Sequence, residues 1–198
     1  MYKNLKLWKV TKPIRKLSQS PSIACQGQIH VSVVTPPINM IQNGDFRDGL
    51  TGWYIPAQGF ISLDSTQGHI APPCLKDSPT SYIDRSTWPI NRTPIKTDGT
   101  QRVYARAWIK TDPSTDTYGG GRIGTDFRQG ETMTKALASL WVPWGNNWTL
   151  AEVLTPYPVD SNTVLIWLQA MLHDNIGTAY FADVELYVLE PGQQPPPT

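Results

Sequence analysis

Three stretches of this chain alternate strictly from one side chain to the next, and this alternation constrains the fold more than any other feature. Residues 103–110, 163–172 and 179–189 each place every second side chain on the same side of an extended backbone. In the first stretch the apolar set is Val103, Ala105, Ala107 and Ile109. A period of two over eight or more residues predicts a β-strand with one face in a core. We therefore expect three long strands, each burying one face.

Shorter runs and turn signals complete the pattern. The weaker strand candidates are 29–34, 58–63, 80–84, 122–127, 136–142 and 147–154, and 131–140 is a candidate short helix. Clusters such as DPSTDTYGGG (112–121) separate these runs, and the chain contains 18 Pro and 15 Gly. Many short strands between such turns predict an all-β chain, folded as a two-sheet antiparallel jelly-roll sandwich.

The segment NMIQNGDFRDGLTGW, residues 39–53, places a large aromatic residue directly after a run of turn formers. Gly49 and Gly52 tolerate backbone angles that other residues rarely adopt. We expect a sharp turn here, with Trp53 beginning the first strand pairing. The indole ring of Trp53 is then predicted to close one end of the core.

Four segments, in order, resemble the carbohydrate-binding-module jelly rolls of the galactose-binding-like type. They are NMIQNGDFRDGLTGW (39–53), VYARAWIKTD (103–112), NNWTLAEVLTPYP (146–158) and GTAYFADVEL (177–186). The resemblance spans about residues 38–190 and implies the same sandwich. Domains of this type occur in sugar-binding modules and in bacteriophage virion proteins, such as capsid decoration (cement) and tail proteins. The resemblance therefore implies the fold more specifically than the function.

The resemblance also implies a structural calcium ion between the opening turn and the last strand, held by oxygen ligands. Two positions depart from the family pattern, because Arg47 follows the Phe of the opening motif and Ala182 replaces the first of two closing aspartates. The remaining candidate ligands are Asp45, Asp48 and Asp183. The alternative is that these are ordinary solvated carboxylates. No other cofactor is expected.

Sugar-binding sites combine aromatic platforms with polar side chains that hydrogen-bond the sugar hydroxyls. If strands 103–110 and 163–172 are neighbours, such a set gathers on one sheet face. Its members are Tyr104, Arg106, Trp108, Trp167 and Gln169. The alternative is that these tryptophans belong to the core. Other tryptophans stand near loops, where they would plug sheet ends or fill a subunit contact: Trp88, Trp141, Trp144 and Trp148.

Signals for catalysis are weak. The three histidines (His30, His69 and His173) are scattered, and none stands in a recognisable nucleophile motif with Ser or Cys. No pair of carboxylates has a spacing that indicates a glycosidase couple. The Gly-rich stretch GGGRIG (119–124) lacks the strand-then-helix context of a phosphate-binding loop. We therefore predict a protein that is not an enzyme.

Charge is distributed unevenly along the chain. Residues 1–44 hold six basic residues and no acidic one, whereas the remainder holds 11 basic and 16 acidic residues. This pattern is typical of an interaction arm, which is expected to become ordered on a partner. Its docking residues are predicted to be Lys3, Lys6, Trp8, Lys9, Lys12, Arg15 and Lys16. The predicted division is an extended basic arm at 1–37, the jelly roll at 38–190 and a Pro-rich tail at 191–198.

Two functions of different classes fit these features. The first hypothesis is a virion structural protein, a phage capsid decoration or cement subunit whose arm docks on major capsid proteins, other virion proteins and copies of itself. The second is a glycan-binding module, either a tail adhesin or an accessory module of a polysaccharide-degrading enzyme. The first predicts synthesis in the host cytoplasm and a final location in the virion.

Two other partner classes are not expected. Nucleic-acid binding through the arm lacks support, because the body carries no basic stripe beside it. Membrane binding is not expected either, since no apolar run approaches the length of a membrane span or of a secretory signal core.

Overall fold

The computed structural model describes residues 35–80, 86–96, 98–114, 119–155, 160–171 and 177–198. Regular structure in this part is entirely β. Its strands are β1 (Ile61–Asp64), β2 (Cys74–Asp77), β3 (Thr93–Pro94), β4 (Arg102–Thr111), β5 (Gly120–Gln129), β6 (Thr132–Ala138), β7 (Thr149–Thr155), β8 (Thr163–Met171) and β9 (Ala179–Leu189). Among these described residues, no helix is long and apolar enough to cross a membrane.

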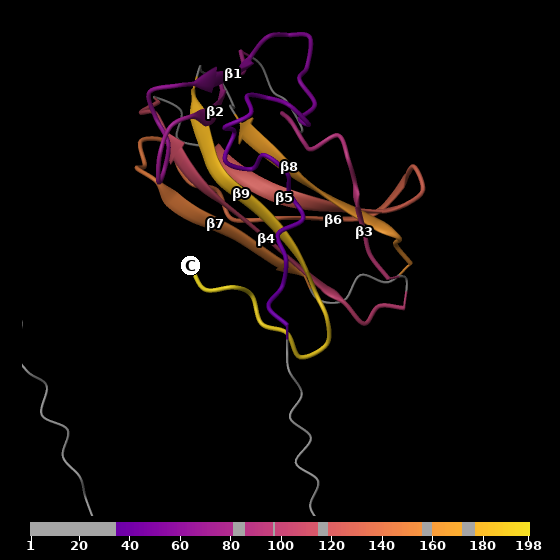
Figure 1. The fold of residues 1–198 in the computed structure, drawn as a ribbon. Coiled ribbons are helices and arrows are strands. Elements are labelled where there is room, and N and C mark those ends of the chain that lie inside the picture. Colours follow the sequence, from indigo (N-terminus) through magenta and orange to yellow (C-terminus); the bar gives the residue numbers. More distant parts are fainter. Residues whose placement is uncertain (1–34, 81–85, 97, 115–118, 156–159, 172–176) are drawn as a thin grey trace, which may run out of the picture. The chain divides into compact units, whose positions relative to one another are not determined.

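The strands form two antiparallel sheets that pack face to face (Figure 1). The five-stranded sheet has the order β1-β2-β9-β4-β7, and the four-stranded sheet has the order β3-β8-β5-β6. Most neighbours in a sheet are distant in sequence, as in the central pairing of β4 with β9. The fold is an all-β jelly-roll sandwich, which confirms the predicted class.

The three strongly alternating stretches form β4, β8 and β9, and their predicted inward faces make the core. On β4 the four alternating apolar side chains are all buried. They meet the inward side chains of three other strands: Ile123 and Phe127 of β5, Val164, Ile166 and Leu168 of β8, and Val184 and Leu186 of β9. Burial of apolar area on both inner faces is the main favourable term that holds the sheets together.

The expectation of a short helix at 131–140 is wrong. Residues Thr132–Ala138 form β6, which pairs antiparallel with β5. Its Met, Lys, Ala and Leu residues favour helix locally, but backbone hydrogen bonding to β5 overrides that preference. Because β6 is an edge strand with only Leu137 half-buried, its sequence shows no clear period of two.

The weaker strand candidates have mixed outcomes. The candidates 58–63, 122–127, 136–142 and 147–154 overlap β1, β5, β6 and β7 respectively. The candidate 29–34 and most of 80–84 lie outside the described residues. Sequence analysis missed β2 and β3, which have four and two residues and are too short to show a period.

The opening segment behaves as predicted. Trp53 is buried, packs on the Phe46 ring at a centroid distance of 5.1 Å, and donates from Nε1 to the Asn43 carbonyl at 3.2 Å. Gly44 lies directly against the last strand, since a Cβ at this position would stand 2.0 Å from the carbonyl oxygen of Val184. Val184 N also donates to the Gly44 carbonyl at 2.9 Å. The opening turn is thus fastened to β9.

The Pro-rich tail contacts the jelly roll of its own chain. Arg102 donates to the Gln193 carbonyl at 2.5 Å, and Arg106 donates to the Pro197 carbonyl at 2.9 Å. Figure 1 shows the chain turning back after β9 and ending near β7. The tail therefore has anchors within its own chain.

Candidate functional site

The outer face of the four-stranded sheet carries a row of polar and aromatic side chains. The register between β5 and β8 sets three pairs opposite each other: Arg122 with Gln169, Gly124 with Trp167, and Asp126 with Leu165. The residues between them on β8, Ile166 and Leu168, belong to the core. Because successive side chains point to opposite faces, the row lies on the outer face.

The indole ring of Trp167 covers residue 124, and this placement requires glycine there. A Cβ on Gly124 would stand 2.1 Å from Cζ2 of Trp167 and 2.6 Å from the carbonyl oxygen of Leu137. Trp167 is only 4% exposed, and its Nε1 donates to Oδ1 of Asp126 at 3.0 Å. The ring of Trp167 is therefore held in one place against this face of the sheet.

Arg122 lies between two tryptophans on the same face. Its Nε donates to Oε1 of Gln169 at 2.8 Å. The guanidinium carbon is 3.9 Å from the ring centroid of Trp141 and 5.4 Å from that of Trp167. Cation–π contacts of this kind hold the guanidinium group in place. The arrangement presents a positive charge next to the half-buried ring of Trp141.

A second aromatic group stands at the opposite border of the face. The rings of Tyr54 and Trp88 stack at 4.3 Å with planes 9° apart, and Tyr54 N donates to the Trp88 carbonyl at 2.8 Å. An antiparallel bridge from Thr87 to Leu168 attaches this segment to β8. Tyr54 remains 42% exposed. The outer face thus has an aromatic side chain at its centre and at both borders.

A cavity of about 170 Å³ lies beside Trp88. It is lined by Trp88, Ile90, Arg92, Asp126, Arg128 and Leu165. Arg128 approaches Asp126, with NH2 to Oδ2 at 3.7 Å. The lining combines flat or apolar surfaces with hydrogen-bonding groups, the combination found in small-molecule and sugar sites. It is suited to binding a polar ligand that also has an apolar face.

The predicted glycan set is divided between two faces. Trp167 and Gln169 lie on the four-stranded sheet as described, but Tyr104, Arg106 and Trp108 lie on the outer face of the five-stranded sheet. The prediction that all five gather required β4 and β8 to be neighbours. They belong to different sheets, so the set does not form one site.

The members of that set on the five-stranded sheet, Tyr104, Arg106 and Trp108, contact other side chains of the same chain. The Tyr104 hydroxyl donates to Glu152, and burial together with this bond raises the pKa of Tyr104 to about 12. Arg106 Nε donates to Glu185 at 2.5 Å. The ring of Trp108 stacks on the ring of His69 at 3.7 Å with planes 11° apart. Their faces are therefore used in packing.

The calcium ligands predicted from the resemblance are not assembled. Oδ2 of Asp183 is hydrogen-bonded to Nδ1 of His69 at 3.0 Å, and Asp45 forms an ion pair with Arg47 at 3.2 Å. Asp48 is exposed. Among the described residues, no group of three or more His, Cys, Asp or Glu side chains could hold a metal ion. With a guanidinium cation beside Asp45, the residues present do not fit a calcium site.

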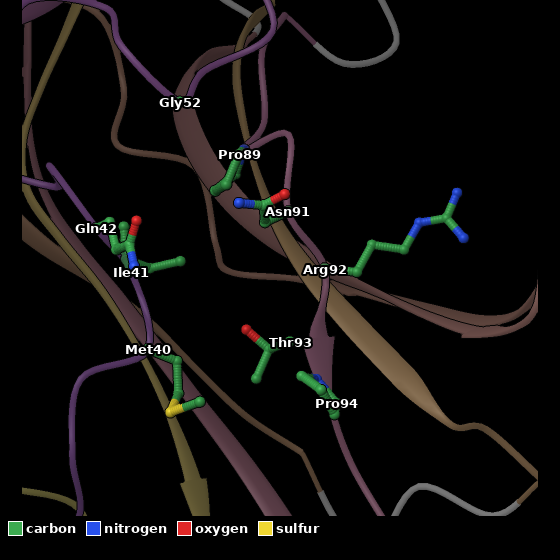
Figure 2. A pocket seen from close by; sticks show the side chains of 9 residues that line it. All are labelled: Met40, Ile41, Gln42, Gly52, Pro89, Asn91, Arg92, Thr93 and Pro94. Atoms are coloured by element: carbon green, nitrogen blue, oxygen red, sulfur yellow. The ribbon is translucent and has the colours of Figure 1, made fainter.

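A further cavity of about 130 Å³ lies between the opening segment and the start of β3 (Figure 2). Met40 and Ile41 line one side, and Asn91 and Thr93 extend toward them from the other. Figure 2 shows the Arg92 side chain pointing away from Met40 and Ile41. Arg92 also lines the cavity beside Trp88, so it is directed toward the outer face of the four-stranded sheet.

Sequence analysis missed most residues of this outer face. The alternation that identifies it was readable within the predicted strand 122–127, where Arg122, Gly124 and Asp126 lie two residues apart. Trp88 and Trp141 were noted only as plugs or contact residues. The predicted docking residues of the basic arm, from Lys3 to Lys16, lie outside the described residues.

Comparison with solved structures identifies the same fold in carbohydrate-binding modules. No protein-family profile and no curated protein matches the chain. The first family-22 module of Paenibacillus barcinonensis Xyn10C, a xylan-binding domain, is 11% identical over 80% of this chain and 99% of that domain, with a TM-score of 0.53. The arabinose-bound family-51 α-L-arabinofuranosidase is 17% identical, with a TM-score of 0.51, over 76% of this chain but only 26% of that enzyme. These likenesses establish a carbohydrate-binding-module-like β-jelly roll.

Proposed function

We propose that this chain is a non-catalytic glycan-binding module that binds a polysaccharide across the outer face of the four-stranded sheet. The observation that carries the proposal is the gathering of Trp88, Trp167 and Trp141 with hydrogen-bonding side chains on one face. Aromatic rings bind the C–H faces of sugars, and the polar groups around them bond the hydroxyls. The xylan-binding neighbour supports the proposal at the level of fold.

The test is a calorimetric titration of the folded protein with a panel of soluble polysaccharides that includes xylan and β-1,4-galactan. We expect at least one member to bind with a dissociation constant between roughly 1 µM and 1 mM. Trp88→Ala should weaken that binding at least tenfold while thermal unfolding remains cooperative. Trp108→Ala, on the opposite sheet, is the matched control and should retain it. Flat titrations across the whole panel contradict the proposal.

A separate proposal concerns where such a module works. We propose that the basic arm, which carries six basic residues and no acidic one, attaches the chain to a larger assembly. The assembly we propose is a phage capsid, on which the chain would be a decoration subunit. Only the charge pattern supports it. A variant lacking residues 1–36 should fold but fail to attach to capsids in a co-sedimentation assay. Undiminished attachment of that variant contradicts this proposal and leaves glycan binding untouched.

A further inference from the structure

We infer that the cavity beside Trp88 accepts a negatively charged sugar residue, so that the ligand is an acidic polysaccharide bearing carboxylates. This inference rests on the proposed glycan-binding function and adds the charge of the ligand to it. It follows from the guanidinium groups around the cavity and from what balances them.

Two arginines and one buried carboxylate line the cavity. Asp126 is 1% exposed, accepts from Trp167 Nε1, and lies 3.7 Å from the guanidinium group of Arg128. Its charge balances that of one arginine. The charge of Arg92, the second arginine of the lining, is balanced by a carboxylate that lies outside the cavity.

The group that balances Arg92 is Glu131, in the turn between β5 and β6. Arg92 NH2 donates to Glu131 Oε2 at 2.5 Å, and Arg92 NH1 donates to the Gly130 carbonyl at 2.8 Å. The Glu131 side chain is 86% exposed and does not line the cavity. An exposed ion pair contributes little net stability because water competes for both charges. A ligand carboxylate can therefore replace Glu131 on Arg92 at small cost.

Arg128 has hydrogen-bonding capacity left over. Its NH1 donates to the Glu131 carbonyl at 2.9 Å, while its NH2 lies 3.7 Å from Asp126 Oδ2, too far for a hydrogen bond, and 24% of the side chain is exposed. Guanidinium groups bind carboxylates through two parallel hydrogen bonds, and these are stronger than bonds between neutral groups. A carboxylate between Arg92 and Arg128 would meet two such groups.

The remaining walls suit the body of a sugar. Trp88, Ile90 and Leu165 provide the apolar part of the lining. A volume of about 170 Å³ is more than ten times the roughly 10–15 Å³ that a single water molecule requires, so the cavity admits a larger ligand. The site therefore matches a single hexuronic acid residue within a longer chain.

The experiment compares two forms of one ligand. Oligogalacturonate is titrated calorimetrically against the full chain, in parallel with the same oligosaccharide whose carboxyl groups have been reduced to primary alcohols. We expect the acidic form to bind at least tenfold tighter. Its affinity should fall as ionic strength rises from about 0.01 to 0.15 M, because the screening length shortens from roughly 30 to 8 Å.

Variants then assign the effect to the cavity. Arg92→Gln and Arg128→Gln should each weaken acidic binding at least fivefold and should narrow the difference in affinity between the acidic and the reduced form. Glu131→Gln should strengthen acidic binding severalfold, because it removes the competing carboxylate. Lys135→Gln is the matched control: it removes one positive charge from exposed β6 outside the lining, and should change neither affinity by more than twofold.

Each outcome has a distinct meaning. If the reduced form binds as well as the acidic form, the charge inference is overturned and the glycan-binding proposal stands. If neither form nor any other polysaccharide binds, both are overturned. Tight acidic binding that ignores Arg92 and Arg128, or that weakens in Glu131→Gln, overturns the assignment to this cavity.

Discussion

The outer faces of the two sheets carry similar aromatic and charged side chains, but these side chains differ in what they contact. On the five-stranded sheet, the Trp108 ring lies against His69, Arg106 binds Glu185 and the tail, and Tyr104 donates to Glu152. On the four-stranded sheet, Trp167 is nearly buried, whereas Trp88 and Trp141 are partly exposed and a cavity lies beside Trp88. The difference teaches that an outward aromatic residue alone does not mark a binding face, and that the cavity beside Trp88 is what distinguishes the four-stranded sheet.

The largest expected effect concerns the link between the two sheets. Asp77 of β2 is fully buried, and its Oδ2 accepts from Ala170 N of β8 at 2.8 Å. Burial raises the pKa of Asp77 from 3.8 to about 7. Because the folded-state pKa is the higher one, the protonated form stabilises the fold. This contribution is complete below about pH 4, and is lost as the pH rises to about 7.

At 1.36 kcal/mol per pKa unit, the loss amounts to about 4 kcal/mol at most. Denaturant unfolding from pH 4 to pH 8 measures it. Since other groups also titrate, the relevant quantity is the difference between the wild type and Asp77→Asn, whose amide does not ionise. The free energy of unfolding should fall more steeply with pH in the wild type. Parallel curves would show that Asp77 does not couple the sheets in this way.

The next effect tests the packing of Trp167 on the outer face of the four-stranded sheet. Gly124→Val forces a side chain into the space of the Trp167 ring and should lower the free energy of unfolding by about 1–3 kcal/mol. Ala138→Val, the exposed partner of Gly124 on β6, is the matched control and should change it by less than about 0.5 kcal/mol. Equal effects of the two substitutions would mean that Trp167 moves aside freely.

A smaller effect tests which of the two outer faces binds the polysaccharide. Trp88→Ala should weaken binding of the polysaccharide identified in the panel at least tenfold, about 1.4 kcal/mol, by removing an aromatic wall. Trp108→Ala should leave affinity unchanged but lower the midpoint of thermal unfolding, because the His69 stack is lost. Calorimetry and a thermal melt on both variants measure the pair. The reverse pattern would place the binding face on the five-stranded sheet.

The smallest expected effect concerns the tail. A chain ending at Gln193 loses the contacts of Pro196 and Pro197 with Arg106, which are partly exposed. The free energy of unfolding should drop by less than about 1 kcal/mol, and glycan affinity should stay the same. New binding by the truncated chain, abolished by Trp108→Ala, would show that the tail covers a second binding face.

Much of the fold could be predicted from local pattern. The alternation of residues 103–110 and 163–172 predicted β4 and β8 with the correct inward faces. For 179–189 the predicted inward face is correct from Val184 onward, but a register shift beside Asp183 also turns Ala179 and Phe181 toward the core. Along a regular strand every second side chain points toward the core, so the sequence pattern alone indicates which side chains are buried. Trp53 was placed correctly for a related reason, since the turn-forming residues that position its ring directly precede it in the sequence.

Other features were not local and could not be predicted. Segment 131–140 has helix-forming residues, and its identity as a strand depends on hydrogen bonds to β5. The placement of Trp108 and Trp167 on different faces depends on which strands become neighbours. Strand order arises from packing between distant segments, and alternation within one strand carries no information about it.

The sequence by itself determined the long strands β4 and β8, their buried sides and the closing of the core by Trp53, because these follow from a residue and its near neighbours. Only the tertiary structure decided which outward residues share a face, which of them are covered, and that Arg92 and Arg128 meet beside Trp88. Those outcomes require strands β3, β5 and β8, which are distant in the chain, to be brought together, and only the packed sandwich does so.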